Sequence, residues 1–113
     1  MASEDPIRVG AVLYLNDLDT GFSSKDVLRW CIVTAVVGRN VRVAGRSTTR
    51  EDGFLIPAGV MPEFDKDGRV PPPPLRVSLK TALAARNIGQ LPSPWLEQLL
   101  FFQNEELAWL PTG

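Results

Sequence analysis

Two arginines, Arg46 and Arg50, surround three consecutive hydroxyl side chains in the segment RSTTR. A guanidinium donates hydrogen bonds in a planar fork that matches a phosphate, and each hydroxyl adds a single donor. The segment follows the alternating stretch VRVAG, so it is expected where a strand meets solvent. Two interpretations remain open: a polar loop that begins at the end of the strand, and a site that binds an anion.

A further arginine, Arg29, lies near the start of an apolar, β-branched run. If the tight turn at 38–40 joins this run to the next strand as a hairpin, the register brings Ser47 and Thr48 close to the level of Arg29. Arg29 then has two interpretations. It is either a solvent-facing strand position or a cation that enters a groove beside the loop 16–26.

The chain contains no histidine and a single cysteine, Cys31, which lies in an apolar run. These two facts exclude Ser-His-Asp and Cys-His nucleophile pairs, histidine acid–base pairs and zinc sites of the usual kinds. Cys31 is expected to pack in the core. Any catalysis therefore depends on Arg, Lys, Asp, Glu, Ser, Thr or Tyr14.

Two pairs of aspartates, Asp17 with Asp19 and Asp65 with Asp67, are the remaining candidates for metal ligands. Each pair lies among turn residues, where Asp commonly caps its own backbone. The segment 64–68 also lacks the spaced ligands and the closing Glu of a calcium loop. We therefore expect neither a metal nor a cofactor.

Length and composition indicate one domain of ordinary globular type, because the chain has 113 residues, of which 44% are hydrophobic and 22% charged. The net charge of −1 gives no overall basic field. The acidic N-terminus does not resemble a secretory signal, and no apolar run approaches the roughly 18 residues of a membrane span. A single cysteine is compatible with a reducing compartment, so a cytoplasmic location without membrane contact is expected.

The apolar alternation predicts a mainly β domain over residues 7–110 after an N-terminal tail at 1–6. Gly45 inside the third strand indicates a bulge or a close backbone approach. The order of several short strands followed by a helix favours a small, strongly bent antiparallel barrel with a C-terminal helix packed against it. The expected strands are 7–15, 28–37, 41–47, 53–56 (which Val60 and Met61 could continue) and 75–79, the last of them preceded by a polyproline II segment at 71–74. Two helices should follow: a short one from the cap Ser78 to Ala85, ended by Asn87 and Gly89, and a long one at 94–110.

The long helix has Ser93 as its N-cap and Pro94 at its first position. Leucines repeat along it at helical spacing, and four aromatic residues lie outside that leucine stripe. A helix that is apolar nearly all round is either sandwiched within its own fold or buried in a partner, and the sequence leaves both open. The leucines are Leu96, Leu99, Leu100, Leu107 and Leu110, and the aromatics are Trp95, Phe101, Phe102 and Trp109.

The order of these motifs resembles the MazF/PemK-type toxins. Gly10 precedes a hydrophobic strand, Arg29 opens a β-branched strand, V-A-G-R-S-T closes the next, and I-G-Q-L-P leads into the last helix. The resemblance implies a small barrel, usually a homodimer, that cleaves single-stranded RNA without metal and is neutralised by an antitoxin protein. The chain differs from the family pattern in having Trp30 where the family has Pro, and Ser-Ser-Lys-Asp at 23–26 in place of a Glu-Gln-Gly-Gly-type run.

By this resemblance the catalytic Arg of the family corresponds to Arg29 and its Thr to Ser47, with Thr48 at the following position. The chemistry would be attack of a ribose 2′-OH on its own phosphate. Arg29, assisted by Arg46, would stabilise the developing charge, and the two hydroxyls would orient the phosphate. Substrate-binding roles are expected for Arg46, Arg50, Ser24 and Lys25, and the only candidates for a general base are Asp19 and Asp26.

A function of another class explains the same residues. The chain could be a non-catalytic small-barrel module, either a degenerate relative of the toxins or a regulator, that binds through the same strand edge or through its aromatic helix. Catalysis requires both Arg29 and the hydroxyls, whereas binding requires only charge or apolar surface.

Overall fold

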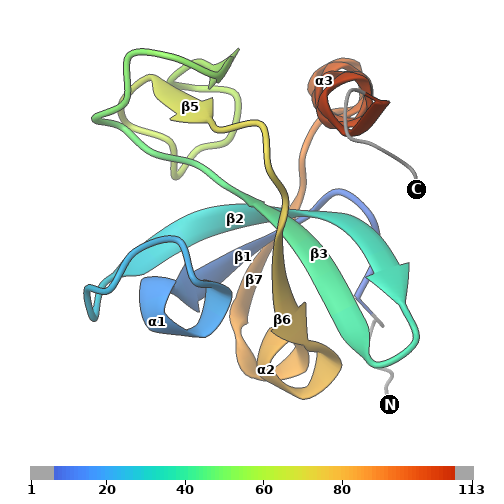
Figure 1. The fold of residues 1–113 in the computed structure, drawn as a ribbon. Helices are drawn as coiled ribbons and strands as arrows, with labels where there is room; N and C mark the ends of the chain where they lie inside the picture. The colour runs from blue at the N-terminus through green and yellow to red at the C-terminus, as the bar shows by residue number, and fades with distance from the viewer. Residues whose placement is uncertain (1–6, 109–113) are drawn as a thin grey trace.

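The computed structural model describes residues 7–108, and side chains as far as Gln103. Seven strands and three helices follow one another along the chain (Figure 1). They are β1 (Ala11–Asn16), α1 (Asp17–Thr20), β2 (Leu28–Val37), β3 (Asn40–Gly45), β4 (Phe54–Ile56), β5 (Gly68–Val70), β6 (Leu75–Ser78), α2 (Leu79–Ala84), β7 (Arg86–Gln90) and α3 (Ser93–Ala108).

Five strands form an antiparallel sheet in the order β6-β3-β2-β1-β7, and β4 pairs with β5 in a separate small sheet. The protein is therefore mainly β, as predicted. Among the described residues no strand pairing joins β6 to β7, so the sheet is bent but is not closed into a barrel. The predicted hairpin is confirmed: β2 and β3 pair with Cys31 opposite Gly45.

Both faces of the five-stranded sheet are buried. Figure 1 shows α1 and α2 on one side of it, and the small sheet and α3 on the other. Alternate residues of each strand supply the two cores, as strand geometry requires. One face brings Ala11, Leu13, Leu15, Cys31, Val33, Val41, Val43 and Val77 against Ala82 of α2; the other brings Val12, Ile32 and Ala44 against Ile56, Met61, Phe64, Val70, Leu91 and Leu99.

Helix α3 packs within its own fold over the part whose side chains are described. Leu99 is fully buried, and Trp95 and Leu96 pack around the second core. The ring of Phe102 contacts that of Phe54 at 5.6 Å between centroids. Phe101 alone of these aromatics is largely exposed, at 65%. Of the predicted stripe, Leu107 lies beyond the described side chains, and Trp109 and Leu110 lie outside the described residues.

Several predicted boundaries were wrong. The first strand begins only at Ala11, because Gly10 turns the chain with a φ of 97° and its N–H donates to Val33 O. The expected loop 16–26 contains α1, which Asn16 caps through a hydrogen bond from Leu18 N–H. Val60 and Met61 do not continue a strand, and β5 was not predicted.

The segment 75–79 is not the final strand. Ser78 does cap α2, accepting from Thr81 N–H at 3.1 Å, but the helix ends at Ala84. Asn87 and Gly89 do not end that helix; they belong to β7, which pairs with β1. Within residues 7–108, no helix is long and apolar enough to cross a membrane.

Candidate functional site at the open end of the hairpin

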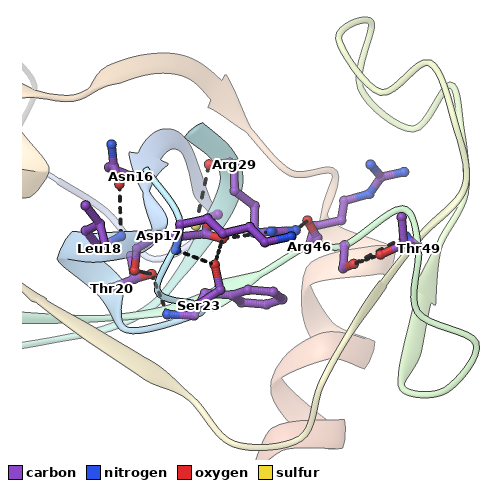
Figure 2. A network of polar contacts seen from close by, with 12 residues as sticks. Asn16, Asp17, Leu18, Thr20, Ser23, Arg29, Arg46 and Thr49 are labelled. Carbon is purple, nitrogen blue, oxygen red and sulfur yellow. Dashed lines mark hydrogen bonds and ion pairs between the residues drawn. The ribbon is translucent and has the colours of Figure 1, made fainter. Parts of the chain in front are cut away.

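The guanidinium of Arg29 is held in a fork by the carboxylate of Asp17. Arg29 Nε donates to Asp17 Oδ1 at 2.8 Å and Nη2 donates to Oδ2 at 2.9 Å. Nη1 donates to the backbone carbonyl of Arg46 at 3.3 Å, so three of the five N–H groups of Arg29 are engaged. Figure 2 shows Arg29 reaching toward Asp17 and Ser23, with Arg46 beside it. Arg29 is therefore neither solvated nor free to approach a ligand with its whole fork.

Asp17 was weighed in the sequence only as a metal ligand, and its pairing with Arg29 was missed. Its side chain is 1% exposed, against 19% for that of Arg29, and Ser23 Oγ donates to Oδ2 at 2.8 Å. The Arg29 fork lowers the pKa of Asp17 below its ordinary value, although burial of the carboxylate acts in the opposite direction. A bidentate Arg–carboxylate pair is the stronger kind of ion pair, so Asp17 keeps Arg29 in one place.

Phe22 completes the surroundings of Arg29. The guanidinium carbon lies 3.8 Å from the centre of the Phe22 ring, within the range of a cation–π contact. The ring lies so close to Gly45 that a Cβ there would meet it at 2.6 Å. The predicted close backbone approach at Gly45 is thus confirmed, and the residue that approaches is Phe22 from the loop after α1.

The predicted register between the two strands is confirmed. Arg46 N–H donates to Trp30 O at 3.1 Å, which extends the pairing of Cys31 with Gly45 by one step. Beyond this point Ser47 pairs through both its backbone N–H and its carbonyl with Arg69 of β5. Ser47 is 3% exposed, and its hydroxyl lies 3.2 Å from that of Thr49.

Arg46 was expected beside Arg29 at the open edge, and the structure places it elsewhere. Directly opposed residues of an antiparallel pair share a face, so Arg46 points to the side of Trp30 and away from Arg29. It is 4% exposed. Its guanidinium donates to the carbonyls of Ile56 and Lys66 and stacks over the Phe64 ring at 4.0 Å. Arg46 thus joins the small sheet to the large one and is not positioned to bind substrate.

The remaining predicted residues are exposed. Thr48 and Arg50 line a groove of about 330 Å³ together with Arg69, which the sequence analysis did not select. Glu51, Leu55 and Asp67 complete its lining. Arg50 also pairs with exposed Asp52 at 2.9 Å, and Arg69 Nη1 donates to Gly53 O at 3.0 Å.

Ser24 and Lys25 lie exposed in the loop between α1 and β2. Of the two candidates for a general base, Asp26 accepts a hydrogen bond from Asn16 Nδ2 at 2.5 Å, and Asp19 lies exposed on α1. Neither carboxylate is among the hydrogen-bond partners of Arg29. In the described part of the chain no three His, Cys, Asp or Glu side chains gather as a metal site.

Cys31 should resist thiol reagents while the protein is folded. It is 1% exposed, and burial raises the pKa of its thiol to about 12, so the reactive thiolate is scarce at neutral pH. Labelling with a maleimide near pH 7, followed by mass spectrometry, should give no adduct in buffer and one adduct in denaturant. Rapid labelling in buffer would show that the strand opens readily.

No protein-family model, curated protein or solved structure matches the chain.

Proposed function

We propose that this chain is a non-catalytic module that binds single-stranded RNA, built on a small β fold like that of the MazF/PemK-type toxins. The observation that carries the proposal is the bidentate pair between Arg29 and buried Asp17. Cleavage through a 2′-OH without metal requires a cation that is free to meet the charge developing on the phosphate. In this chain the corresponding cation already has a carboxylate as its partner.

The hydroxyl of Ser47, which would act with Arg29, is also buried. Ser47 is 3% exposed, and its oxygen also accepts a hydrogen bond from Thr49 N–H at 3.3 Å. A phosphate that took Arg29 away would leave Asp17 buried without its partner. Removing one member of a buried pair is costly, so substrate binding would have to supply that free energy before any chemistry began.

The groove of Thr48, Arg50 and Arg69 supports the binding role. It combines two guanidinium groups with an exposed hydroxyl, the donor set that suits a phosphate. Glu51 and Asp67 share the groove, although Asp67 also accepts a hydrogen bond from Ala58 N–H at 2.9 Å. These carboxylates offset part of the positive charge, so we expect modest affinity that falls quickly with salt.

The second candidate function is the metal-independent endoribonuclease of a toxin–antitoxin pair. The observation in its favour is the hairpin register, which carries the pairing as far as Trp30 and Arg46, the chain neighbours of Arg29 and Ser47. In that function Arg29 would stabilise the phosphate, with Ser47 and Thr48 orienting it. It requires the Asp17 pair to open on substrate binding.

Both functions share the finer features that the toxin resemblance implies. These are a fold of the MazF/PemK type, a homodimer, an antitoxin-like protein partner and a cytoplasmic location. A homodimer predicts a sedimenting species of twice the 12.4 kDa chain mass at micromolar concentration. A monomer at that concentration would remove the dimer from the proposal.

Binding is tested with a fluorescently labelled, unstructured RNA dodecamer, whose anisotropy is followed over a range of salt concentrations. Two phosphate contacts predict a slope of about −1.4 in the plot of log affinity against log salt, because each contact on a single strand contributes about −0.7. Arg50→Gln should lower affinity and reduce the slope by about 0.7. Arg76→Gln is the matched control, since Arg76 is an exposed strand arginine on β6, outside the groove. Equal loss in both variants, or no binding at low salt, would refute the proposal.

A further inference from the structure

We propose that Tyr14, Trp30 and Arg86 form a platform on which a base of single-stranded RNA stacks. The inference rests on the proposed function and adds to it a contact with bases, whereas the groove of Thr48, Arg50 and Arg69 offers contacts with phosphates only.

The sheet brings these three side chains together from three neighbouring strands. Tyr14 on β1 lies directly opposite Trp30 on β2 and directly opposite Arg86 on β7. Directly opposed residues of antiparallel strands point to the same side, so one face presents two aromatic rings and a cation. Arg29 points to the other face, and the platform is therefore independent of the Asp17 pair.

The geometry of the rings is that of a stacking surface. Tyr14 and Trp30 stack with centroids 4.2 Å apart and ring planes 29° from parallel. The guanidinium of Arg86 lies 5.8 Å from the centre of the Trp30 ring. Trp30 packs at the edge of the second core, but Tyr14 and Trp30 are only half-buried and Arg86 is exposed, so the core does not cover this part of the face completely.

A groove of about 520 Å³, within the size range of small-ligand sites, lies between the end of β1 and α2; Tyr14 is among its lining residues, whereas Trp30 and Arg86 are not. Leu28, two residues before Trp30 and 52% exposed, forms part of its wall, and Lys80 supplies a cation. Asp19 also lines it and disfavours a second phosphate on that side. Aromatic faces with a cation beside them, as Arg86 lies beside Trp30, are the chemistry that binds unpaired bases and the phosphates that link them.

The platform explains why this chain has Trp30 at the position where the toxin pattern has Pro. A proline has no aromatic face and no backbone donor. Trp30 instead supplies the larger ring of the stacked pair. Stacking tolerates any base, because every base has a π face, so the platform should bind RNA with little sequence preference.

The test compares the labelled RNA dodecamer with an oligonucleotide of the same length and charge that carries abasic sites at its central positions. Wild type should bind the abasic strand about 5- to 150-fold more weakly, the range that stacking of one base gives. Trp30→Leu keeps apolar packing but removes the ring, and it should bind both strands equally. Trp30→Phe should keep much of the preference, and Arg86→Gln should weaken binding more than the control Arg76→Gln.

The outcomes separate the platform from the proposed function. If wild type binds the two strands equally well, the platform is wrong and phosphate binding stands. If it binds neither, both proposals fail. Because the abasic comparison uses wild-type protein, it decides the question even if Trp30→Leu does not fold.

Discussion

Replacing Asp17 with alanine should lower the free energy of unfolding by about 3 kcal/mol or more. The change removes the partner of a guanidinium that is four-fifths buried and leaves it two residues from the core position Cys31. It also removes the acceptor of the Ser23 hydroxyl, which ties the loop after α1 to the sheet. Urea unfolding followed by circular dichroism measures the loss.

Asp19→Ala is the matched control, because Asp19 lies on the same short helix but is exposed. Its effect should remain within about 0.5 kcal/mol, as for most surface substitutions. Adding Arg29→Met to Asp17→Ala should restore part of the lost stability, since no unpaired charge then remains. Equal stability of Asp17→Ala and Asp19→Ala would show that the ion pair does not hold this end of the hairpin.

The contribution of this pair should also depend on pH. The Arg29 fork lowers the pKa of Asp17 in the folded protein, whereas the unfolded chain has the ordinary carboxyl pKa of about 3.9. The unfolded chain therefore binds protons first as acid is added. The stabilisation is present above about pH 4 and is lost as the pH falls through the lowered folded pKa. The gap in stability between wild type and Asp17→Asn should thus narrow in acid, and a gap that widens there would contradict the assignment.

Replacing Arg46 with methionine should lower the free energy of unfolding by about 3 kcal/mol. The loss of structure should be greatest in the small sheet. Methionine keeps the apolar volume but leaves the buried carbonyl of Ile56 without its donors. It also removes the positive charge of Arg46, which the nearby negative charges of Asp67 and Asp65 stabilise. The Arg46 side chain lies so close to Gly68 that a Cβ there would meet Arg46 Cζ at 2.6 Å, so a differently shaped side chain cannot fill the same space well.

Hydrogen exchange at the amides of Phe54–Ile56 measures this loosening directly. Exchange there should accelerate in Arg46→Met while the β2–β3 ladder changes less. Arg42→Met is the control, because Arg42 lies on β3, the strand that Arg46 directly follows, and is exposed. Unchanged exchange at β4 would mean that packing, and not Arg46, holds the two sheets together.

The hairpin at the centre of the sheet could be predicted because its signals are local. Continuous β-branched residues, a glycine turn and an alternating return strand specify both the pairing and its register. That register holds in the structure as far as Trp30 opposite Arg46. The same register puts Arg46 on the opposite face, beside Trp30, which was overlooked when Arg46 was assigned to the site.

The features that were missed depend on contacts between distant parts of the chain. Nothing local in the sequence indicates that Asp17 meets Arg29, because that contact is set by the path of the loop after α1. β7 has only Ile88 as an apolar side chain, so it carries no strand-like alternation and depends on pairing with β1. Likewise, the strand Gly68–Val70 is too short to show an alternation of apolar and polar residues. Without that strand, the position of Arg69 in the groove could not be predicted from the sequence.

The central claim is that the chain binds single-stranded RNA and leaves it intact, and an integrity assay on bound RNA tests it most directly. Diverse unstructured RNAs are incubated with excess protein, with and without chelator, until binding is complete by anisotropy, and their lengths and ends are then analysed. We expect full-length RNA in every lane, for wild type and for Arg29→Lys alike. Products with 2′,3′-cyclic phosphate ends that wild type forms without metal, and that Arg29→Lys does not form because it lacks the guanidinium fork, would contradict the claim and favour the endoribonuclease.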